Sequence, residues 1–318
     1  MRITGTFLDE ISYDIPHQNW GPKEWRKDFQ AMKAVGIDTV ILIRCGLERF
    51  IAYPSDYLIE QVGCYRPPVD LVELFLTLAD EFQMAFYFGT YDPKHSAPER
   101  IPKILDINLH VIDEAWKRYS AHPSFKGWYL SMEFCRSRMD IVEMDNSLGR
   151  HAKALSGNLP VMISPYIDGK KAVGNNGALT KEDYVTVEQH FREWKDMLAG
   201  AQGAIDTVAF QDGHCEYDEL SEFLEANKKL TDLYGMHSWT NCESFDRDMP
   251  IRFLPIKWEK MRLKLEAAQK AGLEKAITFE FSHFMSPNSM YPTAAHLYER
   301  YSEYVREVPT ASSPSQMQ

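Results

Sequence analysis

The stretch KGWYLSMEF, residues 126–134, is one of eight short runs rich in aromatic, β-branched and aliphatic residues. Runs of this length and composition are typical of buried β-strands. Longer stretches, in which apolar residues recur at helical spacing, separate the runs. The runs start 30 to 47 residues apart, which leaves room for the crossover helix that parallel strands require. They are Ile3–Glu10, Asp38–Gly46, Met84–Asp92, Lys126–Phe134, Leu159–Asp168, Asp206–His214, Met236–Phe245 and Lys275–Met285.

The stretches between these runs carry signals for helix ends. The first predicted helix begins at Pro22 and stops at Gly36, and residues 67–70 (PPVD) open the second. Strand and helix alternate throughout, with neither a Gly-x-Gly-x-x-Gly after the first strand nor a P-loop. The pattern therefore favours a single (β/α)8 TIM barrel over residues 1–308 rather than a doubly wound sheet. Further helices are predicted at Asp106–His122, Thr186–Gln202, Tyr217–Gly235, Phe253–Gly272 and Thr293–Val305.

Composition excludes several classes of protein. The 318 residues are 44% hydrophobic and 25% charged, as in an ordinary globular protein, and no apolar run reaches the ~18 residues of a membrane span. The net charge of −11 disfavours nucleic acid and anionic membranes as partners. Five scattered cysteines without a Cys-x-x-Cys pair predict free thiols. Residues 309–318 are polar, and we expect them to be a disordered tail.

The first residues enter a strand-like run directly, without an apolar signal segment. We therefore expect a cytoplasmic protein, or a periplasmic or secreted one if a leader has been removed. The sequence makes no prediction of the oligomeric state.

Carboxylates stand at the ends of several predicted strands, where the active site of a TIM barrel is built. Alternation along a strand directs Ser131 and Glu133 toward the barrel axis, and Trp128, Leu130 and Met132 beneath the helices. The same argument directs Thr278 and Glu280 inward. Glu243 comes at or just past the end of the seventh run. Several carboxylates around one pocket raise the pKa of at least one of them, which is typical of catalytic or cation-binding sites.

Cleavage of a glycosidic bond requires such carboxylates, one to protonate the leaving oxygen and one to attack the sugar or activate water. We expect Glu133 to be the general acid/base and Glu243 the nucleophile or base, with Glu280 as the reserve candidate. Aromatic faces and polar groups suit a carbohydrate substrate. Residues expected to bind it are Asp9, Glu10, Trp20, Arg44, Tyr91, Tyr166, Gln211, Asp212, His214, Trp239 and Asn241. No cofactor or metal is expected for this chemistry.

Several short motifs follow one another in a recognisable order. They are GTFLD (5–9), WGxxxW (20–25), GIDTVI (36–41), GWYLxxE (127–133), SPY (164–166), QDG (211–213) and WxNxExF (239–245). Together they resemble an uncharacterised domain-of-unknown-function family of glycosidase-like TIM barrels, often from carbohydrate-degrading bacteria. More distantly, the acids ending the fourth and seventh strands, and Arg44 ending the second, resemble the retaining glycosidase superfamily. The resemblance implies a glycoside hydrolase.

Two departures from that superfamily keep alternatives open. Met132 stands where an Asn usually precedes the strand-four acid, and residues 211–214 (QDGH) replace a His-x-Tyr motif. An inverting mechanism, or one with rearranged roles for Glu280 and Asp212, therefore stays open beside retention. A different hypothesis is a sugar isomerase or epimerase that uses Mn²⁺ or Mg²⁺, with ligands among Glu133, Asp212, His214, Glu243 and Glu280. A third is a non-catalytic barrel that binds carbohydrate.

Overall fold

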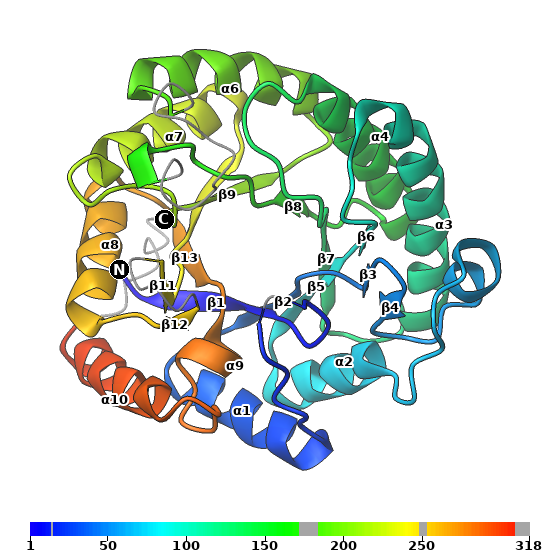
Figure 1. The fold of residues 1–318 in the computed structure, drawn as a ribbon, viewed down its shortest axis with the longest axis horizontal. Coiled ribbons are helices and arrows are strands. Elements are labelled where there is room, and N and C mark those ends of the chain that lie inside the picture. Colours follow the sequence, from blue (N-terminus) through cyan, green and yellow to red (C-terminus); the bar gives the residue numbers. More distant parts are fainter. Residues whose placement is uncertain (14, 172–183, 248–252, 309–318) are drawn as a thin grey trace, which may run out of the picture.

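Eight parallel strands form the centre of the protein. The computed structural model describes residues 1–13, 15–171, 184–247 and 253–308. Successive barrel strands lie side by side, and β1 pairs with β13 to close the barrel. This is the TIM barrel that the sequence predicts (Figure 1). The barrel strands are β1 (Ile3–Leu8), β2 (Thr39–Leu42), β5 (Ala85–Gly89), β7 (Phe125–Tyr129), β8 (Val161–Ile163), β9 (Thr207–Gln211), β10 (His237–Asn241) and β13 (Lys275–Thr278).

A ring of helices surrounds the barrel (Figure 1). The helices predicted from the sequence are present, with ends shifted by a few residues. Pro22 begins the first of them, and the Asp70 carboxylate caps the second by accepting a hydrogen bond from the Glu73 N–H at 2.9 Å. They are α1 (Pro22–Ala34), α2 (Leu71–Phe82), α3 (Ile101–Tyr119), α6 (Val187–Ala201), α7 (Leu220–Tyr234), α8 (Trp258–Lys270) and α10 (Pro292–Glu307).

Helix α4 (Met139–Ser156) is not among the predicted helices. Its buried residues include Asp145 and Gly149 beside Ile141 and Leu148, and these two interrupt the apolar stripe by which a helix is recognised. A Cβ at Gly149 would lie 2.6 Å from the carbonyl oxygen of Ala204. The backbone at Ala204 comes so close to α4 that position 149 has to be glycine. One apolar side chain is therefore missing from the stripe that would have indicated this helix.

Most strand runs are shorter in the structure than the sequence predicts. Strand β7 ends at Tyr129 and β13 at Thr278, although apolar residues that follow them, such as Leu130 and Phe281, are also buried. Short elements occupy these loops and other connections: β3 (Gly46–Leu47), β4 (Phe50–Ile51), β6 (Tyr91–Asp92), β11 (Phe245–Asp246), β12 (Leu254–Pro255), the π-helix Leu58–Val62, the 3-10 helix Pro98–Arg100 and α9 (Phe281–Phe284).

The interior of the barrel is filled by one residue set from alternating strand positions. It consists of Phe7, Ile41, Ile43, Tyr87, Tyr129, Met162, Ala209 and Ile277. Tyr129 is in this set, so the predicted inward orientation of Ser131 and Glu133 agrees with the strand. The parity predicted for the last strand is wrong, because Ile277 faces the interior and Thr278 the opposite side. The Thr278 hydroxyl donates a hydrogen bond to the Cys242 carbonyl oxygen at 2.6 Å.

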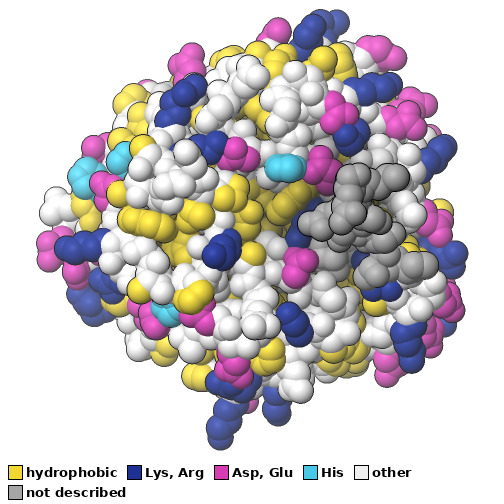
Figure 2. All heavy atoms as spheres, turned by 180° about the vertical axis from the view of Figure 1, so that it is seen from behind, with side chains coloured by type: hydrophobic (Ala, Val, Ile, Leu, Met, Phe, Trp, Pro, Cys, Tyr) yellow, Lys and Arg dark blue, Asp and Glu magenta, His cyan; other side chains and the backbone are white. Residues whose placement is uncertain are grey.

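The surface carries charges of both signs. Acidic and basic side chains are interspersed on the face shown in Figure 2. None of the helices in the described part of the chain is long and apolar enough to cross a membrane. The predicted tail, residues 309–318, lies outside the described residues.

Candidate active site

Glu133 lines a cavity of about 280 Å³ at the C-terminal ends of the strands. The walls come from the loops that follow β1, β2, β5, β7 and β8, so five βα units contribute to it. The lining residues are Ser12, Tyr13, Arg44, Leu47, Asp92, Lys94, Ser96, Met132, Glu133 and Tyr166. Met132 belongs, as predicted, to the buried core that also holds Trp128 and Leu130, and it contributes to this wall as well.

Two neutral side chains donate hydrogen bonds to the Glu133 carboxyl. The Tyr166 hydroxyl donates to Oε2 at 2.5 Å, and the Gln211 amide donates to Oε1 at 3.1 Å. Burial raises the pKa of Glu133, and although the charge of Arg44 and the hydrogen bond from Tyr166 oppose it, the pKa stays above the usual value. A carboxyl in this state holds a proton more readily than an exposed glutamate does.

Arg44 brings a positive charge to the wall of the same cavity. Its Nη1 lies 2.8 Å from Oδ2 of Asp92, and its Nε is buried without a hydrogen-bond partner among the described residues. Although burial lowers the pKa of Arg44, the charges of Glu133, Asp92 and Asp9 raise it above the usual arginine value. The guanidinium thus stays charged and has a donor available for a ligand.

Glu243 lies just past the end of β10 in a cationic environment. Arg247 binds both carboxylate oxygens, through Nε at 2.8 Å and Nη2 at 2.7 Å. Burial alone would raise the pKa of Glu243, but the charge and hydrogen bonds of Arg247, with the charges of Lys264 and His214, hold it below the usual value. Glu243 is therefore an ionised carboxylate.

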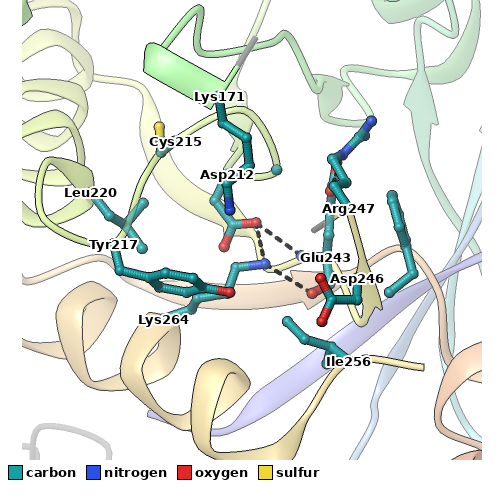
Figure 3. Close-up of a pocket in the computed structure, with 12 residues that line it drawn as sticks. Lys171, Asp212, Cys215, Tyr217, Leu220, Glu243, Asp246, Arg247, Ile256 and Lys264 are labelled. Atoms are coloured by element: carbon teal, nitrogen blue, oxygen red, sulfur yellow. Dashed lines mark hydrogen bonds and ion pairs between the residues drawn. The ribbon is translucent and has the colours of Figure 1, made fainter. Parts of the chain in front are cut away.

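A second hollow, with room for about one water molecule, contains Glu243 (Figure 3). Its volume is about 10 Å³, and its walls also include Asp212, Arg247 and Lys264. Gly213 lies against the carboxylate, where a Cβ would come within 1.8 Å of Glu243 Oε2. Only glycine allows the loop after β9 to approach this closely.

The two glutamates line different hollows that are electrostatically connected. Arg247, which binds Glu243, has its pKa raised by Glu133 and Tyr166 as well as by Glu243 itself, although burial lowers it. The Tyr166 ring in turn stacks on the His214 ring at 5.3 Å. Arg247 and Tyr166 therefore link the surroundings of Glu133 and Glu243.

Several residues expected to bind the substrate surround these hollows. Tyr166 and Gln211 contact Glu133 directly, as described above. The Asn241 amide donates to Ser164 Oγ at 3.4 Å, while its Oδ1, the Oδ2 of Asp9 and the Nδ1 of His214 are buried without partners in the described part of the chain. Unsatisfied buried polar atoms are costly unless water or a ligand completes them. Unlike these atoms, the Asp212 carboxylate has partners: it pairs with Lys264 and accepts a hydrogen bond from the Glu243 N–H.

Three aromatic residues expected to bind the substrate lie elsewhere. Trp20 packs edge-on against Trp25 at 5.1 Å. Tyr91 is buried and donates a hydrogen bond to the Glu48 carbonyl oxygen at 2.6 Å. Trp239 faces the barrel interior at the level of Lys275, the first residue of β13. Aromatic residues suit a sugar site, but these three pack against other parts of the protein. Their positions along the chain place their rings outside the two hollows.

Glu280 caps α9 and lines neither hollow. Its carboxylate accepts hydrogen bonds from the Ser282 and His283 N–H groups at 2.9 and 2.7 Å and also contacts the His283 ring. The His283 ring bonds through Nε2 to the Pro16 carbonyl oxygen at 2.9 Å, and Gln18 bonds to the Ser282 carbonyl oxygen. These bonds join the loop after β1 to the segment after β13.

Glu10 lies near this junction with a perturbed carboxyl. Burial raises its pKa to about 7, against the charge of His283. Its Oε2 has no hydrogen-bond partner among the described residues.

Several charged residues of the site were missed by sequence reasoning. Asp92 ends the two-residue strand β6 and Arg247 follows the two-residue strand β11. In such short elements a charged residue carries no signal of its own. Lys264 does carry one, because it shares the buried side of α8 with Met261, Leu265 and Ala268.

The candidate metal ligands are held by other partners. Asp212 pairs with Lys264, Glu243 with Arg247 and Glu280 with His283. In the ranges that the structure describes, no three His, Cys, Asp or Glu side chains are arranged to hold a metal ion.

Comparison with known proteins agrees with the fold and the motifs. Residues 3–291 match the family described as Domain of unknown function (DUF4434). The chain belongs to this family. The resemblance to an uncharacterised family of glycosidase-like barrels is thereby confirmed. No curated protein is significantly similar to this DUF4434 chain in sequence.

Solved structures similar to this DUF4434 chain include glycosidases. A crystal structure from Bacteroides thetaiotaomicron, provisionally named an alpha-L-fucosidase, is 54% identical with a TM-score of 0.89, covering 96% of this chain and 93% of that chain. An endo-1,4-beta-mannanase from Rhizomucor miehei is 10% identical with a TM-score of 0.61, covering 96% and 95%. A xylanase from Thermoanaerobacterium saccharolyticum is 9% identical with a TM-score of 0.53, covering 87% and 85%. The last two show the fold alone.

Proposed function

We propose that this protein is a glycoside hydrolase in which Glu133 protonates the leaving oxygen and Glu243 is the nucleophile or the base that activates water. The observation that carries the proposal is the contrast between their contacts. A phenol and an amide bind Glu133, whereas a guanidinium binds Glu243. Burial raises the pKa of Glu133, and the charge of Arg44 and the hydrogen bonds from Tyr166 and Gln211 offset the rise only in part. Burial also acts on Glu243, but Arg247 brings the pKa of this carboxylate below its usual value. The two pKa values are thus displaced in opposite directions, as an acid and its ionised partner require.

Glu133 is placed to serve as the acid. It lines the larger cavity, where a substrate has space, and its raised pKa keeps a proton available. After it has given that proton away, the Tyr166 hydroxyl and the Gln211 amide stabilise the carboxylate. The same two groups fix the direction in which the carboxyl faces.

Glu243 can act although Arg247 binds both of its oxygens. A carboxylate has about four lone-pair positions, and the bidentate arginine uses two of them. The remaining lone pairs can meet a water molecule, for which the hollow at Glu243 has room, whereas attack on an anomeric carbon requires the sugar to reach Glu243 from the cavity of Glu133. The alternatives of retention and inversion correspond to these two uses.

A carbohydrate suits the cavity around Glu133. Arg44, Asp92 and the hydroxyls of Ser12 and Ser96 offer donors and acceptors for sugar hydroxyls, and the exposed ring of Tyr13 offers a flat apolar face. The provisional name of the Bacteroides relative makes an α-L-fucoside the first substrate to test.

The test is hydrolysis of a panel of 4-nitrophenyl glycosides, beginning with the α-L-fucoside and including β-mannosides and β-xylosides. We expect the wild type to cleave at least one, and Glu133→Gln and Glu243→Gln each to lose about 10³-fold in kcat/KM. Glu143→Gln, at an exposed position of α4, is the matched control and keeps its activity within about twofold. Proton NMR of the first sugar formed distinguishes retention from inversion.

Two outcomes would contradict the proposal. If both Glu133→Gln and Glu243→Gln still cleave the substrate, these two carboxylates are not the catalytic pair. Binding of oligosaccharides with no cleavage across the panel would favour the non-catalytic barrel instead.

A further inference from the structure

A buried ion pair lies directly behind Glu243. Nζ of Lys264 is 2.6 Å from Oδ1 of Asp212, with only 6% and 2% of the two side chains exposed. Removing two charges from water costs free energy, and a packed apolar pair often replaces a buried ion pair without loss of stability. The charges at this position therefore need an explanation other than stability.

Both members of the pair bind the backbone of Glu243 (Figure 3). The Glu243 N–H donates to Asp212 Oδ1 at 3.1 Å, and Lys264 Nζ donates to the Glu243 carbonyl oxygen at 2.9 Å. The neighbours Cys242 and Ser244 instead donate from their backbone N–H groups to the segment containing β13. Within the described ranges, the hydrogen bonds to the Glu243 backbone thus come from the two members of the ion pair, on the side of β9 and α8.

Charged groups reach Glu243 from each element packed around it. Arg247 comes from its own loop, Asp212 and His214 from the loop after β9, and Lys264 from α8, with the Cys242 thiol adjacent. Arg247 and Lys264 favour the ionised carboxylate, whereas Asp212 opposes it. The Asp212–Lys264 pair therefore contributes two opposite charges at close range.

We propose that Asp212 and Lys264 are positioning residues for Glu243. The pair fixes the peptide groups on both sides of Glu243, and the Lys264 cation helps to keep its carboxylate ionised. Any consequence for turnover rests on the proposed function, whereas the effect on Glu243 itself does not.

The test is to titrate Glu243 by ¹³C NMR in protein labelled at glutamate Cδ, with the resonance assigned by its absence in Glu243→Gln. We expect Lys264→Met to raise the Glu243 pKa by about one unit, because a nearby cation is lost. Asp212→Asn is expected to lower it, because an anion is lost while an acceptor for the Glu243 N–H remains. Arg262→Met is the matched control, since Arg262 lies on the same helix in an exposed pair with Glu266 and leaves the pKa unchanged.

Opposite shifts in the two variants support the proposal, because a loss of packing would not produce opposite signs. An unchanged Glu243 pKa, or shifts in the same direction, would overturn it. If Lys264→Met does not fold, Asp212→Asn decides alone: a fall supports the proposal and no change overturns it. Failure to find any cleaved glycoside would count against the proposed function and leave this titration intact.

Discussion

The two ends of the barrel use charged residues differently. At the N-terminal ends of the strands, Lys275 pairs with Asp38 and His237 with Glu274, each at 2.6 Å and each with at least one well-exposed partner. At the C-terminal ends, pairs such as Asp212–Lys264 are buried. Exposed pairs contribute about 0–1 kcal/mol, whereas buried charges carry a desolvation cost. The difference indicates that the buried charges serve a site rather than the stability of the fold.

Among variants that keep both glutamates, the largest expected effect comes from Gly213→Ala at the C-terminal end. A Cβ there would meet Glu243 Oε2 at 1.8 Å and Arg247 Nε at 2.5 Å, so the loop or the carboxylate must move. A displacement of this order at a reacting group costs about 10²-fold in rate. We expect that loss in kcat, measured on the glycoside that the wild type cleaves.

Gly200→Ala is the control for that substitution. Gly200 lies in α6, where a Cβ meets its nearest neighbour at 3.4 Å. Activity is expected to stay unchanged, with a small gain in stability. Equal activity in the two alanine variants would mean that the geometry at Gly213 does not matter for catalysis.

The second prediction concerns pH. Glu243 must be ionised and its pKa is lowered, so activity falls on the acidic side as Glu243 gains a proton. Glu133 must be protonated and its pKa is raised, so activity falls on the alkaline side as Glu133 loses one. We expect a bell-shaped profile of kcat/KM, and loss of its alkaline limb in the residual activity of Glu133→Gln. An alkaline limb that persists in this variant would assign the acid to another residue.

The third and smallest effect is on stability. Glu133 in the folded protein keeps a proton that the unfolded chain releases above the usual glutamate pKa, so this residue lowers stability as pH rises. Glu133→Gln removes the ionisable group. We expect it to raise Tm by about 1–3 °C at pH 8 and by less at pH 5, measured by calorimetry.

Lys275→Met supplies the comparison from the opposite end. It removes an ion pair in which Asp38 is well exposed, together with a hydrogen bond to Thr39, so stability should fall by about 1 kcal/mol and activity should not change. If Lys275→Met lost much stability, or if Glu133→Gln gained none, the two ends of the barrel would not differ in the way described.

Sequence periodicity predicted the barrel, and it placed Glu133 and Glu243 at the C-terminal ends of the fourth and seventh barrel strands, where the structure also has them. Glu133 lies past Tyr129, where β7 ends, and still reaches the cavity at the strand ends, as the alternation predicts. Glu280 does not, because Ile277 and not Thr278 faces the barrel interior and because α9 begins directly after Glu280.

Other site residues could not be predicted from residue type, because their roles depend on where the fold places them. Tyr91 and Trp239 were chosen because aromatic rings suit sugars, but depth along a strand decided their positions. Arg247 became visible only once the fold brought it to Glu243. Lys264 could have been found, since a lysine in line with Met261, Leu265 and Ala268 breaks an apolar stripe.

The bonds from His283 and Gln18 that join the loop after β1 to the segment after β13 also bear on how the protein is made. The first of these regions leaves the ribosome long before the second, because 267 positions separate Pro16 from His283. Until residues 280–290 emerge, the early loop lacks these partners. The mouth of the barrel can therefore take its final shape only after this late segment has emerged, so a nascent chain would not bind ligand in its native manner before then.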